Sequence, residues 1–175
     1  MILLGLGANL RHPDFATLVD TFQAAVEVLA ARGIKATLRS RLFNSAPVPA
    51  SAQPWFVNGV IRVETDFGPS ELLNTLHSVE AVFGRTRREK GEARVLDLDL
   101  LAFNELQSSF SPILPHPRLH ERAFVLLPLA DIAPSWRHPT LKKPLCVLVG
   151  DLSAGYVATP LELEEYPVNW FSGLL

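Results

Sequence analysis

The sequence predicts an α+β fold of the ferredoxin-like type, in which a βαββαβ chain forms one antiparallel sheet with helices on one face. The first observation behind this prediction is the order of segments with strand-like and helix-like periodicity along residues 2–103. The second is size: 175 residues, 48% of them apolar, suffice for one core without disulfide or metal support. The third is that the 14 prolines are spread over the loops between these segments and form no linker. The chain is therefore expected to form a single domain.

The first half of the chain is expected to form a strand, a helix and a pair of strands. Residues 2–6 are an apolar run that ends in a glycine-permitted turn at residues 5–9. Over residues 14–31 apolar side chains recur at three- and four-residue steps, which predicts an amphipathic helix. Residues 34–42 alternate weakly and residues 58–65 alternate clearly between the two faces of a strand.

The second half is expected to add a helix and a strand. Residues 69–84 carry one apolar stripe between a starting proline and a terminating glycine, which predicts a helix followed by a basic loop. Residues 94–103 then alternate like a strand, and a further helical stretch is expected near residues 123–130. Residues 151–175 show no clear periodicity. We expect them to be a C-terminal extension that wraps the domain formed by residues 1–150, and not a separate domain.

Charge and cysteine content exclude several classes of protein. The 16 Lys and Arg against 18 Asp and Glu give a net charge of −2, so attraction of the whole surface to nucleic acid or to an anionic membrane is not expected. Cys146 is the single cysteine, which excludes an internal disulfide and favours a cytoplasmic location. No apolar run approaches the roughly 20 residues of a membrane span, and no leader segment is expected. Any anion site must therefore be local.

The strongest chemical signal is the segment Leu-Asp-Leu-Asp-Leu at residues 96–100. Side chains i and i+2 share a face of a strand, so Asp97 and Asp99 point the same way. They would lie roughly 7 Å apart and repel each other by about 2 kcal/mol at an effective dielectric constant of 20. A divalent cation would remove this repulsion, and Mg²⁺ prefers carboxylate and phosphate oxygens. The pair therefore predicts a Mg²⁺–nucleotide site, the alternative being solvent-facing aspartates on a half-buried strand.

A basic run at residues 85–94 directly precedes the two aspartates. Arginine has a planar fork that matches phosphate oxygens, so Arg85, Arg87 and Arg94 are candidates to clamp a polyphosphate. The alternative is a solvated charged loop, which the two glutamates in the same run would support.

Aromatic and amide side chains meet at residues 53–58, Gln-Pro-Trp-Phe-Val-Asn, where a loop leads into a strand. Stacking surfaces beside amide groups suit a flat heterocycle. Phe124 is a candidate for a second stacking surface, and it follows a segment that carries His116 and Arg122. For each phenylalanine taken separately, simple core packing is the alternative.

Five segments in this order resemble the 6-hydroxymethyl-7,8-dihydropterin pyrophosphokinase family. They are residues 5–10, 53–58, 80–87, 94–99 and 115–129. The resemblance extends over residues 1 to about 140. It implies an enzyme of folate biosynthesis that transfers pyrophosphate from ATP to the hydroxymethyl group of a pterin and releases AMP.

The resemblance also implies a role for individual residues. For catalysis it implies Arg85, Arg94, Asp97 and Asp99, and the two aspartates would also hold two Mg²⁺ ions. For ATP binding it implies Glu80, Arg87, His116 and Arg122. For pterin binding it implies Ser45, Val48, Phe56, Asn58 and Phe124. Phe56 and Phe124 would stack on the pterin ring. Asn58 and the backbone near residues 45–48 would form hydrogen bonds with the edge of that ring.

The expected partners are ATP and 6-hydroxymethyl-7,8-dihydropterin, with neither nucleic acid nor membrane. The resemblance implies a possible association with neighbouring folate-pathway enzymes, and we expect a monomer. Two alternative functions stay open: a diverged Mg²⁺-dependent phosphotransferase or phosphatase, and a non-catalytic ferredoxin-like binding module. An RNA-binding module would need exposed aromatic residues on its central strands, where this sequence places carboxylates.

Overall fold

The computed structural model describes residues 1–48, 50–85, 92–153, 158–162 and 170. In chain order the elements are β1 (Ile2–Ala8), α1 (Leu18–Ala31), β2 (Lys35–Arg39), β3 (Phe43–Ser45), β4 (Phe56–Glu64), α2 (Pro69–Val82), β5 (Asp97–Phe103), a 3₁₀ turn (Leu119–Glu121), α3 (Ala123–Ile132), α4 (Leu145–Gly150) and β6 (Ala158–Pro160). The strands form one antiparallel sheet in the order β5-β1-β4-β3-β6, with β2 also paired to β4. The predicted α+β fold is confirmed.

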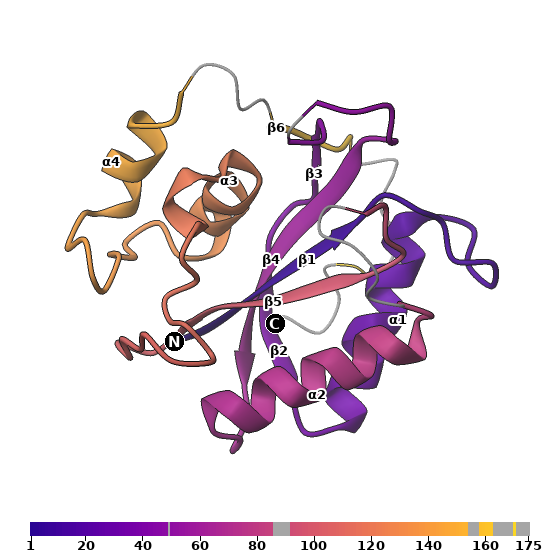
Figure 1. Ribbon diagram of the computed structural model, residues 1–175, viewed down its shortest axis with the longest axis horizontal. Coiled ribbons are helices and arrows are strands. Elements are labelled where there is room, and N and C mark those ends of the chain that lie inside the picture. The colour runs from indigo at the N-terminus through magenta and orange to yellow at the C-terminus, as the bar shows by residue number, and fades with distance from the viewer. Residues whose placement is uncertain (49, 86–91, 154–157, 163–169, 171–175) are drawn as a thin grey trace.

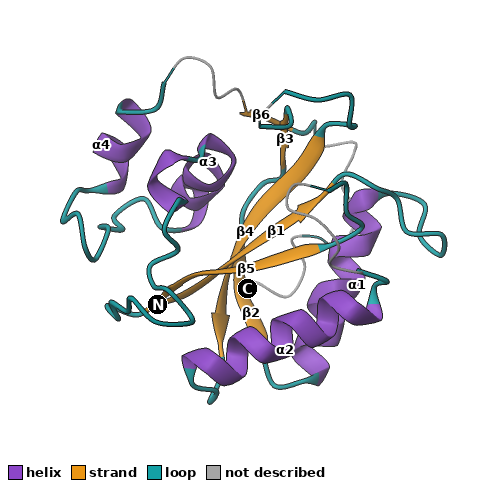
Figure 2. Cartoon of the chain, viewed as in Figure 1, coloured by secondary structure: helices purple, strands orange, loops and turns teal. Residues whose placement is uncertain are grey.

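Helices cover both faces of the sheet, whereas the sequence analysis placed them on one. Helices α1 and α2 lie on one side of the crossing strands and α3 and α4 on the other (Figures 1 and 2). Two separate apolar clusters fill these layers, one between the sheet and α1/α2 and one between the sheet and α3/α4. The extra layer forms because alternate strand residues such as Leu3, Val60 and Leu101 present a second apolar surface to α3. No helix in the described part of the chain is long and apolar enough to cross a membrane.

Helix α1 begins later than the sequence predicted because a capping box sets its start. The Thr17 side chain accepts from the backbone N–H of Asp20, and the Asp20 carboxylate accepts from the backbone N–H of Thr17. These bonds satisfy amides that the first helical turn leaves without partners. The helix ends before Gly33, which adopts a φ of +83° that is accessible to glycine at low cost.

Within the predicted strand at residues 34–42 the structure has β2 at residues 35–39, and a second short strand that was not predicted, β3, follows at residues 43–45; the two pair with successive parts of β4. The interruption lies at Ser40, whose hydroxyl accepts from the backbone N–H of Val60 at 2.9 Å in place of a regular ladder bond. Here Leu42 packs against the backbone of Gly59, where a Cβ atom would come within 2.6 Å of Leu42 Cδ2. Any other residue at position 59 would force the buried Leu42 side chain to shift.

The described residues of the C-terminal extension pack onto the domain at two places. Strand β6 pairs with β3, with Ala158 opposite Ser45. Trp170 is fully buried in the cluster beneath α1, 6.4 Å from the ring of Phe22. Its indole N–H donates to the Ser40 carbonyl at 3.1 Å. The extension therefore covers a sheet edge and completes part of the core.

Candidate active site

A cleft of about 590 Å³ is lined by residues of the sheet, of α2 and of α3. Strands β1, β4 and β5 form its floor, and the segment leading into α3 forms one wall. Of the predicted site residues that the structure describes, all except Glu80 line this cleft. They are Ser45, Val48, Phe56, Asn58, Arg85, Arg94, Asp97, Asp99, His116, Arg122 and Phe124. The fold thus collects into one cavity residues that are far apart in the sequence.

The cleft floor is shaped by two glycines that the sequence analysis assigned to a turn. That assignment is wrong, because β1 continues through both glycines to Ala8. In the sheet register Gly5 lies opposite Asp99, and Gly7 lies between Asp97 and Asn58. A Cβ atom at Gly7 would come within 3.3 Å of Asn58 Oδ1. The missing side chain therefore keeps the floor open between a carboxylate and an amide.

The two carboxylates lie among three arginines. Arg85 donates to Asp97 Oδ1, and Arg94 donates to Asp97 Oδ2. Arg122 Nη1 lies 3.6 Å from Asp99 Oδ2. Asp97 therefore accepts hydrogen bonds from two guanidinium groups. The arginine next to Asp99 lies farther from its carboxylate.

Burial and the adjacent Asp97 carboxylate raise the pKa of Asp99 above 3.8, although His116, Arg122 and Arg85 act in the opposite direction. Burial likewise lowers the pKa of His116 below its usual 6.5, although the Asp99 carboxylate acts in the opposite direction. His116 Nδ1 accepts from the backbone N–H of Arg118 at 3.2 Å, which leaves the ring proton on Nε2. The cleft thus contains a carboxylate whose negative charge the protein alone stabilises poorly.

The carboxylate pair fits a hard divalent cation. Both side chains offer oxygen ligands on one face of β5, and a bound cation would relieve the unfavourable charge on Asp99. The described residues contain no cluster of three or more His, Cys, Asp or Glu side chains suited to a metal. A cation at Asp97 and Asp99 would therefore need further oxygen ligands from water or from a phosphate group, as Mg²⁺ commonly has.

Glu80 lies behind the cleft and does not line it. It is 1% exposed at the end of α2. Its Oε1 atom accepts from the backbone N–H of Leu98 at 2.8 Å and also from Arg85 Nη1. Glu80 therefore positions Arg85 relative to β5. Arg87, predicted to bind ATP, lies outside the described residues.

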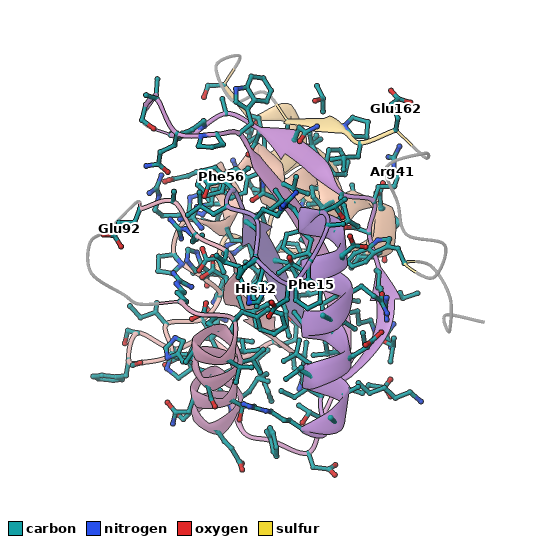
Figure 3. The ribbon with its side chains drawn as sticks, turned by 90° about the vertical axis from the view of Figure 1, so that its right-hand side faces the viewer. His12, Phe15, Arg41, Phe56, Glu92 and Glu162 are labelled. Carbon is teal, nitrogen blue, oxygen red and sulfur yellow. The ribbon has the colours of Figure 1, made fainter. Side chains whose placement is uncertain are left out.

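Aromatic and amide groups also line the cleft. The part lined by Phe56, Phe124 and Asn58 is called its aromatic end below, and the part lined by Asp97 and Asp99 is called its carboxylate end. Phe56 comes from β4 and Phe124 from α3, and both rings line the cavity. The buried Asn58 amide donates to Ser45 Oγ at 2.9 Å. Arg94 lies 5.6 Å above the Phe56 ring, next to the carboxylate end. Figure 3 shows Phe56 on the same side of the molecule as Glu92, which is near Arg94 in the chain.

Sequence reasoning assigned no site role to several residues that line the cleft, among them Gly7, His77 and Arg118. Arg118 lies in the basic segment before Phe124, so its proximity to His116 and Arg122 was an available signal. Gly7 and His77 carry no such signal, because only the register of β1 and the packing of α2 bring them to the cavity.

Comparison with known proteins identifies related sequences. The model of a family described as 7,8-dihydro-6-hydroxymethylpterin-pyrophosphokinase matches residues 3–134. A Methylorubrum extorquens protein named 2-amino-4-hydroxy-6-hydroxymethyldihydropteridine pyrophosphokinase is 41% identical over 133 residues, 75% of this chain and 81% of the relative. A Synechocystis protein of the same name is 36% identical over 149 residues, 84% of this chain and 73% of the relative. An Arabidopsis thaliana folate synthesis bifunctional protein is 37% identical over 75% of this chain and 23% of its own length.

Solved structures show the same fold. Wild-type HPPK-DHPS from Plasmodium falciparum with SDX-DHP superposes with a TM-score of 0.62 at 16% identity. The match covers 85% of this chain and 43% of that one, so this chain spans less than half of the Plasmodium protein. A triple mutant of that protein superposes with a TM-score of 0.65.

Proposed function

Because the chain belongs to the 7,8-dihydro-6-hydroxymethylpterin-pyrophosphokinase family, we propose that the cleft is where it transfers pyrophosphate in folate biosynthesis. ATP donates its β- and γ-phosphates to the hydroxymethyl group of 6-hydroxymethyl-7,8-dihydropterin, and AMP leaves. One observation supports assigning this activity to the cleft: a pair of carboxylates, surrounded by arginines, lines the same cavity as two aromatic rings. Neither a phosphatase nor a non-catalytic module is favoured by the family match.

We assign the carboxylate end of the cleft to ATP. Asp97 and Asp99 would hold Mg²⁺, two ions with ATP bound, and the metal would offset phosphate charge and polarise phosphoryl oxygens. Arg85, Arg94 and Arg122 would bind phosphate oxygens through charge-assisted hydrogen bonds. His116 would donate from Nε2, since its Nδ1 atom already accepts a backbone bond. Glu80 would act through Arg85, and Arg87 keeps its predicted role in ATP binding.

In the transfer itself, the hydroxymethyl oxygen attacks the β-phosphorus of ATP. A new oxygen–phosphorus bond forms, the bond from the β-phosphorus to the oxygen bridging to the α-phosphorus breaks, and AMP leaves with that oxygen. The hydroxyl proton is released. The main contribution of the protein is to hold the two substrates in line and to place Arg85, Arg94 and Arg122 where negative charge develops.

We assign the aromatic end of the cleft to the pterin. Phe56 and Phe124 would stack on the ring, and Asn58, Ser45 and the backbone near Val48 would bond its polar edge. Replacing Phe124 with alanine is expected to weaken pterin binding roughly 30-fold, about 2 kcal/mol, while Mg²⁺–ATP binding changes less than threefold. Isothermal titration with each substrate measures both constants.

The matched control for this variant is Phe110→Ala, since Phe110 is 82% exposed and does not line the cleft. Both substrates should bind it as they bind the wild-type protein. Equal losses of pterin and ATP affinity in Phe124→Ala would contradict the stacking role.

The experiment that tests the function is AMP release from ATP with and without 6-hydroxymethyl-7,8-dihydropterin, in Mg²⁺ and in EDTA. AMP formed only with pterin and Mg²⁺ is the expected result. Formation of ADP or free phosphate, or no product from a folded protein, would contradict the assignment.

We further propose that residues 1–150 form the catalytic domain with residues 151–175 as its extension, that the protein is a monomer, and that it acts in the cytoplasm. Association with neighbouring folate-pathway enzymes is supported by relatives such as the Arabidopsis bifunctional protein. Sedimentation of the purified chain, alone and with such an enzyme, measures both the oligomeric state and the association.

A further inference from the structure

Asn9 lies just beyond the end of β1 and does not line the cleft, but its side chain bonds to Arg94, which does, and to the loop that precedes Phe56. Its side chain is buried, with the residue 4% exposed. The Oδ1 atom accepts from the backbone N–H of Arg94 at 2.7 Å. The Nδ2 group donates to the Pro54 carbonyl and to Gln53 Oε1, both at 3.2 Å. One amide therefore joins two segments that lie far apart in the sequence.

Each segment leads directly to a group placed in the active site. Arg94 donates to Asp97 and lies over the ring of Phe56. Pro54 precedes Phe56 by two residues, so the carbonyl that Asn9 holds belongs to the loop that introduces this ring. The Asn9 side chain therefore contributes to the spacing between Arg94 and the loop that introduces Phe56.

The backbone near Asn9 holds Arg94 independently of the side chain. The backbone N–H groups of Asn9 and Leu10 both donate to the Arg94 carbonyl, at 2.9 and 3.0 Å. These two bonds do not involve the side chain and remain available when Asn9 is replaced by alanine or aspartate. Loss of the side chain is therefore expected to loosen the connection between the segments without releasing Arg94 from β1.

We infer that Asn9 is a positioning residue for the transfer reaction, an inference that rests on the proposed function. Asn9 keeps the hydroxyl of the pterin, which binds at the aromatic end, at the correct distance from the ATP phosphates, which bind at the carboxylate end. Errors of about 1 Å in such a distance lower rates on the order of 100-fold, because the reacting atoms must be nearly in contact and in line. Asparagine suits this position because its side-chain amide can accept a hydrogen bond at the oxygen and donate hydrogen bonds from the nitrogen.

Two substitutions of Asn9 distinguish the hydrogen bond to Arg94 from the hydrogen bonds to Gln53 and Pro54. Asn9→Ala removes all three side-chain bonds and is expected to lower kcat about 10- to 100-fold; because it also loses both donated bonds, it should raise KM for the pterin about 5- to 10-fold while KM for ATP stays within twofold. Asn9→Asp keeps an acceptor for the Arg94 N–H but loses both donated bonds at the aromatic end. It is expected to raise KM for the pterin about 5- to 10-fold and leave KM for ATP within twofold.

Two control variants accompany these measurements. Asn74→Ala removes an exposed asparagine on α2 and is expected to leave kcat and both KM values unchanged. Val26→Ala destabilises the core beneath α1 without touching the cleft, so it reports how a general loss of stability affects the rate.

Several outcomes would overturn the inference. The first is a kcat for Asn9→Ala within twofold of wild type. The second is a fall in kcat that Val26→Ala reproduces at equal loss of stability. The third is for Asn9→Asp to raise both KM values equally. An inactive wild-type protein would overturn the proposed function and the inference together, which distinguishes that failure from the others.

Discussion

Replacing Asp99 with asparagine is expected to lower the rate of AMP formation about 1,000-fold, or ~4 kcal/mol, and to make the metal-free protein more stable. The rate falls because the amide is a poor ligand for Mg²⁺ and adds no negative charge to the site. Stability rises because burial and Asp97 make the ionised Asp99 carboxylate unfavourable in the folded state. A single residue would then oppose folding while supporting catalysis.

The sign of this stability effect follows from proton binding. The pKa of Asp99 is higher in the folded state than its ordinary value of 3.8, so between those two pKa values the folded state binds more protons than the unfolded state. The contribution of Asp99 to stability therefore decreases as pH rises through that window. Since Mg²⁺ binds the ionised carboxylate, metal affinity should weaken as pH falls through the raised pKa.

The measurement is a melting curve in EDTA at several pH values, together with AMP release in Mg²⁺. The melting temperature of Asp99→Asn should exceed that of wild type by a margin that grows with pH. Asp14→Asn is the control, since Asp14 is exposed and does not line the cleft. An Asp99→Asn variant with activity within tenfold of wild type would contradict the metal assignment.

Asp97→Asn should lose activity to a similar degree without the gain in stability. The reason is local: Asp97 accepts from both Arg85 and Arg94, so its removal leaves two guanidinium groups facing each other without a shared carboxylate. A stability gain in Asp97→Asn equal to that of Asp99→Asn would show that the two aspartates have equivalent surroundings, contrary to the structure.

Replacing Trp170 with alanine is expected to lower the free energy of unfolding by about 3–5 kcal/mol. Trp170 has no exposed area and packs on Phe22. The Arg39 guanidinium lies 5.3 Å from its ring and donates to its carbonyl. Truncation would leave a cavity under α1 and remove the indole bond to Ser40. Since small domains are stable by only about 5–15 kcal/mol, this loss is a large fraction of the total.

Urea denaturation measures the effect, with Trp55→Ala as the matched control. Trp55 is 55% exposed, so its removal is expected to change the free energy of unfolding by less than about 1 kcal/mol. A loss below 1 kcal/mol for Trp170→Ala would mean that the extension adds little to the core.

The sequence by itself determined β1, α1, β2, β4, α2, β5 and α3 in their order and the placement of Asp97 and Asp99 on one face of β5, but not β3, α4 or β6. These are local properties: the two-residue period of a strand and the signals at helix ends act within a few residues. Even so, the strand predicted from residue 94 begins at Asp97, because the backbone of Arg94 bonds to Asn9 instead of a neighbouring strand.

Only the tertiary structure decided which distant residues share the cleft. The register of β1 on β5 places Gly5 and Gly7 beside the aspartates, and the packing of α3 brings Phe124 to the cavity that Phe56 lines. Glu80 was predicted to bind ATP, yet its contacts place it behind Arg85. Sheet register and helix packing depend on contacts between residues far apart in the chain, which no local period in a single sequence specifies.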